Sequence, residues 1–230
     1  MKEFKNFKEQ YLQEGVYDPG IFKAYFLAGG PGSGKTFVTK GAFAGTGLKL
    51  VNSDSIFEKY LKDEGLSLKM PEKEKMTRDR LRQKAKINNL ARLDLYIQGR
   101  LGLIIDGTAR DYALISRQQR LCKFLGYQTS MIFINTSLDV ALERNKKRER
   151  TVPEHVTKTS WKTVQSNMGK FNSLFGSSNF HVIDNNKSEQ ELVTLTLNRA
   201  SGIVRKTMNQ PHNWLAKQWI QQQLRAKQRT

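Results

Sequence analysis

The stretch Gly29-Gly30-Pro31-Gly32-Ser33-Gly34-Lys35-Thr36 decides the fold, because it matches the phosphate-loop pattern G-x-x-x-x-G-K-[ST] in full. Apolar residues at 24–28 favour a buried strand before it, and residues 36–43 favour a helix after it. The glycines therefore lie where backbone N–H groups and a helix dipole can bind a polyphosphate. The sequence predicts a nucleoside triphosphate site; the alternative is a Gly/Ser turn that binds nothing.

The same pattern assigns roles to side chains of the loop. Lys35 would reach the β- and γ-phosphates, and the Thr36 hydroxyl would ligate Mg²⁺. The predicted cofactors are therefore ATP and Mg²⁺. The residues predicted to bind the nucleotide are Gly30, Pro31, Gly32, Ser33, Gly34, Lys35 and Thr36.

The composition favours one domain and a charged partner. With 230 residues the chain suffices for one sizeable α/β domain and an appendage. A net charge of +18, from 39 Lys and Arg against 21 Asp and Glu, favours a polyanionic partner such as nucleic acid. The alternative is a charge that only keeps the surface soluble.

A single cysteine, Cys122, excludes internal disulfides and Cys-rich zinc sites, and indicates a reducing compartment. We expect it in the buried part of a helix. No run of about 18 apolar residues is present, and residues 1–5 lack the apolar stretch of a signal peptide. We expect a soluble cytoplasmic protein without membrane contact.

Strand-like and helix-like segments alternate along the chain. Strands are expected at 24–28, 48–52, 101–106, 129–134 and 180–184, and helices at 36–43, 112–124, after an N-cap at Ser137, and at 154–171. This alternation predicts an α/β fold, a P-loop NTPase three-layer sandwich with a five-stranded parallel sheet, a helical lid and a C-terminal helix. The expected parts are a lead-in at 1–20 that packs as a short helix, a main domain at 21–205 and a basic C-terminal helix at 206–230.

Within the main domain we expect a helical insert at 71–100 and a lid at 144–153. Residues 69–100 contain ten basic and four acidic residues, typical either of a solvated helix or of a helix pair that forms one wall of a substrate cleft. The intermittent apolar face of this segment consists of Leu81, Ala85, Leu90 and Leu93.

The C-terminal segment is basic too, since no acidic residue follows Glu191. A final helix is expected to begin at Pro211 and to dock on the core; stacking on single-stranded nucleic acid is the alternative. Its predicted apolar seam consists of Trp214, Leu215, Trp219 and Leu224.

Carboxylates follow two of the expected strands. Asp54 could accept a proton from a hydroxyl that attacks the γ-phosphate, or cap a helix that begins at Ser55. Asp106 would hold Mg²⁺ through water or orient the acceptor, and which of the two carboxylates is the base stays open. Arg110, four residues on, could contact an anionic group of the acceptor.

A group of cations follows the fourth strand. Arg144, Lys147 and Arg148 are spaced i, i+3, i+4, which would place them on one helical face with Arg150 just beyond. Such a cluster could close over the triphosphate and offset the charge that develops during transfer. A basic surface patch is the alternative.

These residues resemble the kinase domain of phage-type 5′-polynucleotide kinases and of zeta-toxin-like P-loop kinases, over about residues 22–186. The resemblance lies in Asp54, Asp106-Gly107-Thr108, Arg144-Asn145-Lys146-Lys147-Arg148, Val152-Pro153 and Val156. It implies that Lys35 and Thr36 bind phosphate and metal, that Asp54 is the general base, and that Arg148, with Arg144 beside it, binds the donor phosphates. It also implies a phage-encoded protein in the host cytoplasm.

One departure concerns the acceptor. Polynucleotide kinases of this type have an arginine shortly after the base, whereas Ser55-Ile56-Phe57-Glu58 follows Asp54 here. We expect a kinase of a nucleic acid 5′ end or a nucleotide; the alternatives are a kinase of a small metabolite or nucleotide sugar, and an ATP-dependent nucleic-acid-binding protein. The expected catalytic residues are Lys35, Asp54, Arg144 and Arg148, the acceptor-binding residues Asp54, Asp106 and Arg110, and the metal ligands Thr36 and Asp106.

Overall fold

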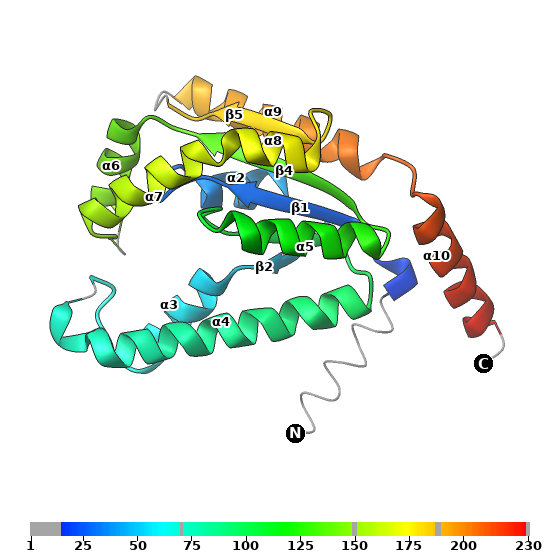
Figure 1. The fold of residues 1–230 in the computed structure, drawn as a ribbon, viewed down its shortest axis with the longest axis horizontal. Coiled ribbons are helices and arrows are strands. Elements are labelled where there is room, and N and C mark those ends of the chain that lie inside the picture. Colours follow the sequence, from blue (N-terminus) through cyan, green and yellow to red (C-terminus); the bar gives the residue numbers. More distant parts are fainter. Residues whose placement is uncertain (1–14, 70, 149–150, 187–189, 229–230) are drawn as a thin grey trace.

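A parallel sheet of five strands forms the centre of the molecule (Figure 1). The computed structural model describes residues 15–69, 71–148, 151–186 and 190–228. The strands are β1 (Lys23–Ala28), β2 (Lys49–Val51), β3 (Leu103–Asp106), β4 (Gln128–Asn135) and β5 (Phe180–Asp184), in the order β2-β3-β1-β4-β5. All four neighbouring pairs are parallel, which confirms the predicted sheet.

The order of the strands determines where a ligand can bind. After β1 the chain crosses to β2 at one edge of the sheet, whereas after β4 it continues to β5 at the other edge. The carboxyl ends of the neighbouring strands β1 and β4 therefore flank the crevice in which open α/β sheets bind ligands. The phosphate loop follows β1 directly.

Helices cover both faces of the sheet, which makes three layers. In Figure 1, α2 (Lys35–Ala42) and α9 (Gln190–Met208) lie behind it, and α5 (Tyr112–Phe124) and α8 (Met168–Phe175) lie in front. Side chains of β1 alternate between the two layers, as a strand buried on both faces requires. Tyr25 and Leu27 belong to the cluster with α2 and α9, and Ala24 and Phe26 to the cluster with α5 and α8.

The helical insert is one long helix, α4 (Lys75–Gln98), preceded by the short 3₁₀ turn η2 (Glu72–Glu74). Its last two turns pack on the sheet, and its first half pairs with α3 (Ser53–Asp63). The α3–α4 pair has a small core of its own, formed by Ile56, Phe57, Leu61, Leu81 and Ala85. Leu90 does not join the predicted apolar face, because 49% of it is exposed.

The remaining helices lie at opposite ends of the sheet. In Figure 1, α6 (Leu138–Lys146) and the start of α7 (Glu154–Ser166) lie at the end toward which β1 points, and α10 (Trp214–Lys227) lies at the other end, near the 3₁₀ turn η1 (Gly15–Tyr17). The predicted N-cap of α6 is confirmed, since Ser137 Oγ accepts a hydrogen bond from Val140 N at 3.3 Å. None of the described helices is long and apolar enough to cross a membrane.

Two helix boundaries differ from the prediction. The helix expected at 154–171 is divided into α7 and α8 at Asn167, whose buried side chain donates to the backbone oxygen atoms of Ala109 and Arg110. The predicted N-cap role of Asp54 is wrong, because α3 begins at Ser53 and Asn52 caps it. A tertiary contact of Asn167 determines the first boundary. An asparagine two residues before Asp54 determines the second.

The C-terminal helix begins at Trp214 rather than Pro211, and Asn213 caps it. Its docking on the core is confirmed, since Ala216 is fully buried and the Trp219 ring packs edge-on against Phe22. The predicted seam is nevertheless wrong at three positions, because Trp214, Leu215 and Leu224 are exposed. The expected helix within the lead-in lies mostly outside the described residues, and the boundary expected at 205/206 falls inside α9.

Candidate active site

The phosphate loop joins β1 to α2, and two neighbouring elements pack directly on it. Gly34 caps α2 with a left-handed backbone, at φ 92°. Gly32 has φ 81°, and a Cβ there would lie 2.1 Å from the backbone oxygen of Ala141 in α6. Glycine at this position therefore lets α6 pack against the loop. Gly30 lies below α7, where a Cβ would meet the backbone of Trp161 at 3.6 Å.

Asn185, after β5, holds the loop through a hydrogen bond. Its Nδ2 donates to the backbone oxygen of Ser33 at 2.8 Å, and its own backbone oxygen accepts from Arg144 Nη1 at 2.7 Å. Arg144 is thus connected to the loop through Asn185. The Ser33 hydroxyl is buried and has no hydrogen-bond partner among the described residues. Asn185 was not predicted from the sequence, because no local pattern links it to a loop about 150 residues earlier.

Lys35 lies at the start of α2 with its side chain folded over the loop. Its Nζ donates to the backbone oxygen atoms of Gly29 at 2.5 Å and Gly30 at 3.2 Å. Burial lowers the pKa of Lys35, while the carboxylates of Asp106 and Asp54 act to raise it. The amine and both predicted carboxylates are therefore within electrostatic reach of one another.

Asp106 ends β3 beside the strand that leads into the loop, in register with Leu27. Burial raises its pKa, and both the charge of Lys35 and a hydrogen bond from Asn52 act to lower it. Asn52 Nδ2 lies 2.7 Å from Asp106 Oδ2. Asn52 was not predicted from the sequence, although an asparagine between a strand and a helix is a frequent N-cap.

Asp54 occupies the first turn of α3, where the positive end of the helix dipole favours a carboxylate. Its backbone N–H donates to Asn52 Oδ1 at 2.7 Å. Its side chain is half-exposed and lies 3.6 Å from Nη1 of Arg82, a residue of α4. The insert thus contacts Asp54 through Arg82, and its role as one wall of a substrate cleft stays a prediction. Arg82 was missed because it follows Asp54 by 28 residues.

Thr36 and Asp106 supply the donors that Mg²⁺ prefers, a hydroxyl and a carboxylate. Thr36 is exposed on the first turn of α2, and Asp106 is partly exposed at the end of β3. No cluster of three or more His, Cys, Asp and Glu side chains suited to a metal exists among the described residues. This small donor set fits Mg²⁺ held chiefly by water and nucleotide phosphates.

The cations of the lid segment, residues 144–153, do not share one helical face. Helix α6 ends at Lys146, so Lys147 and Arg148 lie beyond its regular part. Lys147 pairs with Glu143 at 2.6 Å on the exposed side, and Arg150 lies outside the described residues. Arg148 is exposed, and its charge adds to burial in lowering the pKa of Lys35. Of this cluster, Arg148 therefore acts electrostatically on the loop.

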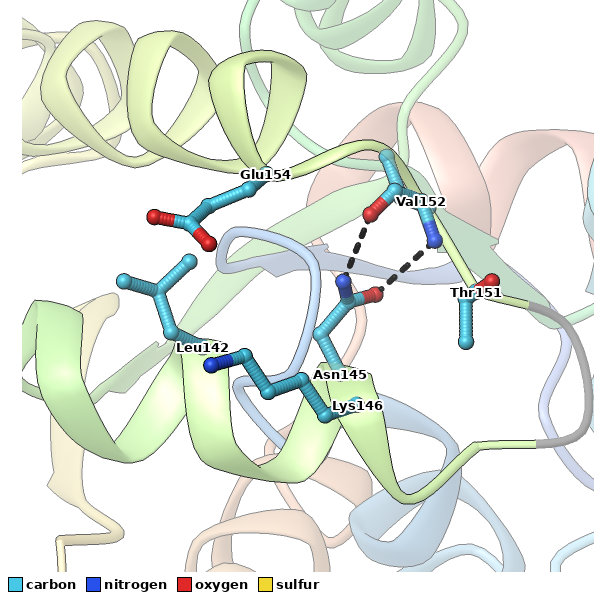
Figure 2. A pocket seen from close by; sticks show the side chains of 6 residues that line it. All are labelled: Leu142, Asn145, Lys146, Thr151, Val152 and Glu154. Carbon is cyan, nitrogen blue, oxygen red and sulfur yellow. Dashed lines mark hydrogen bonds between the residues drawn. The ribbon is translucent and has the colours of Figure 1, made fainter.

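Two hydrogen bonds join Asn145, near one end of the lid segment, to Val152, near the other end (Figure 2). Asn145 Nδ2 donates to the backbone oxygen of Val152 at 2.6 Å, and Val152 N donates to Asn145 Oδ1 at 3.1 Å. Beside this pair lies an open pocket of about 280 Å³. Its lining consists of Leu142, Asn145, Lys146, Thr151, Val152 and Glu154.

Arg110 lies on the loop between β3 and α5, with its side chain exposed. Asn167 holds the backbone of this loop through the oxygen atoms of Ala109 and Arg110. The predicted contact of Arg110 with an acceptor stays a prediction.

A family model described as AAA domain matches residues 25–171, which is more than half of the 230-residue chain. Among curated proteins, none matches the sequence at a significant level.

Solved structures with a similar fold include three from different proteins. A gluconokinase from Sinorhizobium meliloti 1021 has a TM-score of 0.51 and 15% identity over 82% of this chain and 95% of its own. A structure of the PezAT toxin–antitoxin system of Streptococcus pneumoniae has a TM-score of 0.52 and 16% identity, over 90% of this chain and 96% of its own. A structure of AvrRxo1-ORF1:-ORF2 with ATP has a TM-score of 0.55 and 15% identity, over 80% of this chain and 64% of its own. At such identities the likeness establishes the fold.

Proposed function

The chain belongs to the AAA-domain family, and its fold is similar to that of a gluconokinase. From this premise we propose that it is a P-loop kinase, which transfers the γ-phosphoryl group of ATP to a hydroxyl group of an acceptor. One observation carries the proposal. The amine of Lys35 and the carboxylates of Asp54 and Asp106 interact electrostatically at the carboxyl end of the sheet, next to the phosphate loop. A nucleotide-binding switch needs the loop and a metal ligand, whereas transfer to a hydroxyl also needs a base.

The proposed reaction assigns one task to each group. Asp54 accepts the proton of the acceptor hydroxyl as its oxygen attacks the γ-phosphorus. A new oxygen–phosphorus bond forms while the bond from the γ-phosphorus to the β–γ bridging oxygen breaks, and ADP leaves with that electron pair. Lys35 holds the β- and γ-phosphates during this step. Mg²⁺, bound with Thr36 and Asp106, would neutralise phosphate charge.

Arg148 has the position of a charge-stabilising residue. It lies just beyond α6, and its charge acts on the Lys35 amine at the loop. In the proposal, its guanidinium offsets the negative charge that develops on the transferring group. Arg144 has a different task, because its hydrogen bond to Asn185 connects α6 to the segment that holds the loop.

For the acceptor we propose a nucleic acid 5′ end or a nucleotide. The support is the charge of α4, which has seven basic and two acidic residues and reaches Asp54 through Arg82. The basic helix α10 does not extend this surface, since it docks through Trp219 on Phe22, at the amino end of β1. Six residues of strand, roughly 20 Å, separate that end from the phosphate loop. The nucleic-acid surface is therefore limited to α4 and its surroundings.

A small metabolite is the second candidate acceptor. Its support is the similarity in fold to a gluconokinase and to the PezAT system, which covers most of both chains. This support is weaker, because these chains are only 15% and 16% identical to this one. The phage origin implied by the resemblance stays a prediction.

The test is a transfer assay with ATP labelled at the γ-phosphate. Acceptors would be a 5′-hydroxyl oligonucleotide, nucleosides, nucleotides, nucleotide sugars and gluconate. We expect label on an oligonucleotide or nucleotide with the wild-type protein, and none with Lys35→Ala, which loses the phosphate contact. Label on a sugar or nucleotide sugar alone would favour the metabolite kinase. Label found only as free phosphate would contradict the kinase and favour an ATP-dependent binding protein.

A further inference from the structure

Arg82 lies between the proposed base and an aromatic ring. Its Nη1 is 3.6 Å from Asp54 Oδ1, and its guanidinium carbon is 4.1 Å from the centre of the Phe57 ring. Phe57 is 1% exposed, so the ring is a fixed support within the core of the α3–α4 pair. The Arg82 side chain is 37% exposed, and that of Asp54 is 47% exposed. Both charged groups are therefore accessible from solvent at the site.

This arrangement prepares the guanidinium for an oxyanion. The guanidinium has five N–H donors in one plane. Its contact with the buried Phe57 ring restricts the position of the group before a ligand binds, which lowers the entropy lost on binding. A planar fork of donors matches the oxygen atoms of a phosphate group in bidentate fashion.

The positive charge of α4 around Arg82 is larger than the single carboxylate of Asp54 can neutralise. Arg78, Arg82 and Lys86 follow one another at intervals of four residues, on one side of α4. The acidic residues of α4 are Asp79 and Asp94, against seven basic ones. This excess favours a group with more charge than a carboxylate, as a phosphate has.

We propose that Arg82 binds a phosphate group of the acceptor, so that the acceptor is a compound with a phosphate close to its reactive hydroxyl. The proposal rests on the proposed kinase function. The phosphate takes the place of Asp54 at Arg82, and the carboxylate is then available to the acceptor hydroxyl. Arg82 Nη1 lies only 3.6 Å from Asp54 Oδ1. The hydroxyl that faces Asp54 and the phosphate that binds Arg82 therefore belong to the same small part of the acceptor, such as one nucleotide. A mononucleotide and the 5′-terminal nucleotide of a nucleic acid share this chemistry.

Binding to matched ligands tests the proposal directly. The ligands are uridine, uridine 3′-monophosphate and a 5′-hydroxyl oligouridylate, each measured by calorimetry with the phosphate loop saturated by a non-hydrolysable ATP analogue. The variants are Arg82→Met, which keeps the stem, and Arg82→Lys, which keeps the charge without the planar fork. Arg120→Met, which alters an exposed arginine of α5 outside the proposed acceptor surface, is the control.

For the wild-type protein and Arg120→Met, we expect uridine 3′-monophosphate to bind about 10-fold or more tightly than uridine, as for hydrogen bonds to charged groups. Arg82→Met should abolish this preference, and Arg82→Lys should retain part of it. Equal affinities of the wild-type protein for uridine and uridine 3′-monophosphate, without Arg82-dependent binding of the oligouridylate, would overturn the proposal. An unchanged preference in Arg82→Met would overturn it as well. Arg82-dependent binding of the oligouridylate alone would assign the phosphate to a nucleic acid, and binding of the mononucleotide would assign it to a nucleotide.

The transfer assay separates this inference from the function on which it rests. Arg82-dependent binding of the phosphorylated ligand without transfer of label to any acceptor contradicts the kinase but supports the phosphate site. Transfer with the same KM for phosphorylated acceptors in Arg82→Met and in the wild-type protein supports the kinase but contradicts the phosphate site.

Discussion

Asn52 donates a hydrogen bond from its side-chain amide to the Asp106 carboxylate, with Nδ2 2.7 Å from Oδ2. The other end of the same amide accepts from the backbone N–H of Asp54, also at 2.7 Å. One side chain therefore fixes the end of β3 relative to the first turn of α3. The two carboxylates of the proposed mechanism depend on this residue for their relative position.

Substitutions at Asn52 should separate its two hydrogen bonds. Asn52→Asp keeps an acceptor for the Asp54 N–H but places a second carboxylate against Asp106, so we expect the transfer rate to fall about 10-fold or more. Asn52→Ala loses the cap and should lower the free energy of unfolding by about 1 kcal/mol. Urea denaturation and steady-state transfer measure these effects. The control is Ser55→Ala, an exposed residue in the same turn. Wild-type activity in Asn52→Asp would mean that Asp106 does not need this partner.

The proposed role of Arg148 predicts an effect on catalysis rather than on binding. Arg148→Ala should lower kcat by a larger factor than it weakens ATP affinity, because its charge acts mainly on the transition state. Arg199→Ala, an exposed arginine of α9, should change neither quantity. Steady-state kinetics and ATP titration measure both. A loss of ATP affinity as large as the loss of kcat would assign Arg148 to ground-state binding.

The buried Lys23 at the start of β1 predicts a pH-dependent stability. Its Nζ donates to the backbone oxygen atoms of Thr207 at 3.1 Å and Gln210 at 2.6 Å, at the end of α9. Burial lowers its pKa from the usual 10.5 to about 8. Between these values the unfolded chain holds a proton that the folded protein has lost, so this residue makes the free energy of unfolding rise with pH from 8 to 10.5.

Urea denaturation at several pH values within this window measures the effect. The rise should be smaller in Lys23→Met than in the wild-type protein, and unchanged in Lys40→Met, which alters an exposed lysine of α2. The same pH dependence in Lys23→Met and the wild-type protein would contradict the assignment to Lys23.

Salt dependence distinguishes a nucleic-acid acceptor from a metabolite. Each phosphate neutralised on a single strand contributes about −0.7 to the slope of log affinity against log salt, so four to six contacts give roughly −3 to −4. Replacing both Lys84 and Lys86 of α4 by Gln should make this slope shallower by about 1.4. The control replaces Lys217 and Arg225 of α10, a helix that lies at the other end of the sheet.

Fluorescence anisotropy with a labelled oligonucleotide gives the slopes. Point variants are preferable to removal of α10, since its docking buries Ala216 and covers Phe22. An affinity for the oligonucleotide that does not depend on salt would contradict the proposed nucleic-acid acceptor. A shallower slope in the α10 variant alone would contradict the assignment of the binding surface to α4.

Local patterns predicted the parts of the fold that depend on neighbouring residues. The bounds of α5 and β5 are those predicted, and β1, α2 and the cap of α6 follow from the phosphate loop and from Ser137. The prediction of Cys122 as a buried residue of a helix is also confirmed. In each of these cases the apolar period or the capping residue agrees with the tertiary structure.

The errors occurred where a distant residue decides the local structure. Asn167 interrupts a helical pattern because its side chain binds the loop that contains Ala109, and this partner is about 60 residues away. The cation spacing 144–148 predicted one face of a helix that ends at Lys146. Arg82 could not be assigned to the site, because only the pairing of α3 with α4 brings it to Asp54.

The proposed base provides the most direct test of the central claim that this chain transfers a phosphoryl group to a hydroxyl. The measurement is the single-turnover rate of transfer from ATP by Asp54→Asn, with ATP affinity determined in parallel. The account predicts unchanged ATP affinity and a rate lower by about 10² to 10⁴, the usual cost of removing a general base. A near-normal rate on the true acceptor would contradict it, because Asp54 would then serve only the first turn of α3.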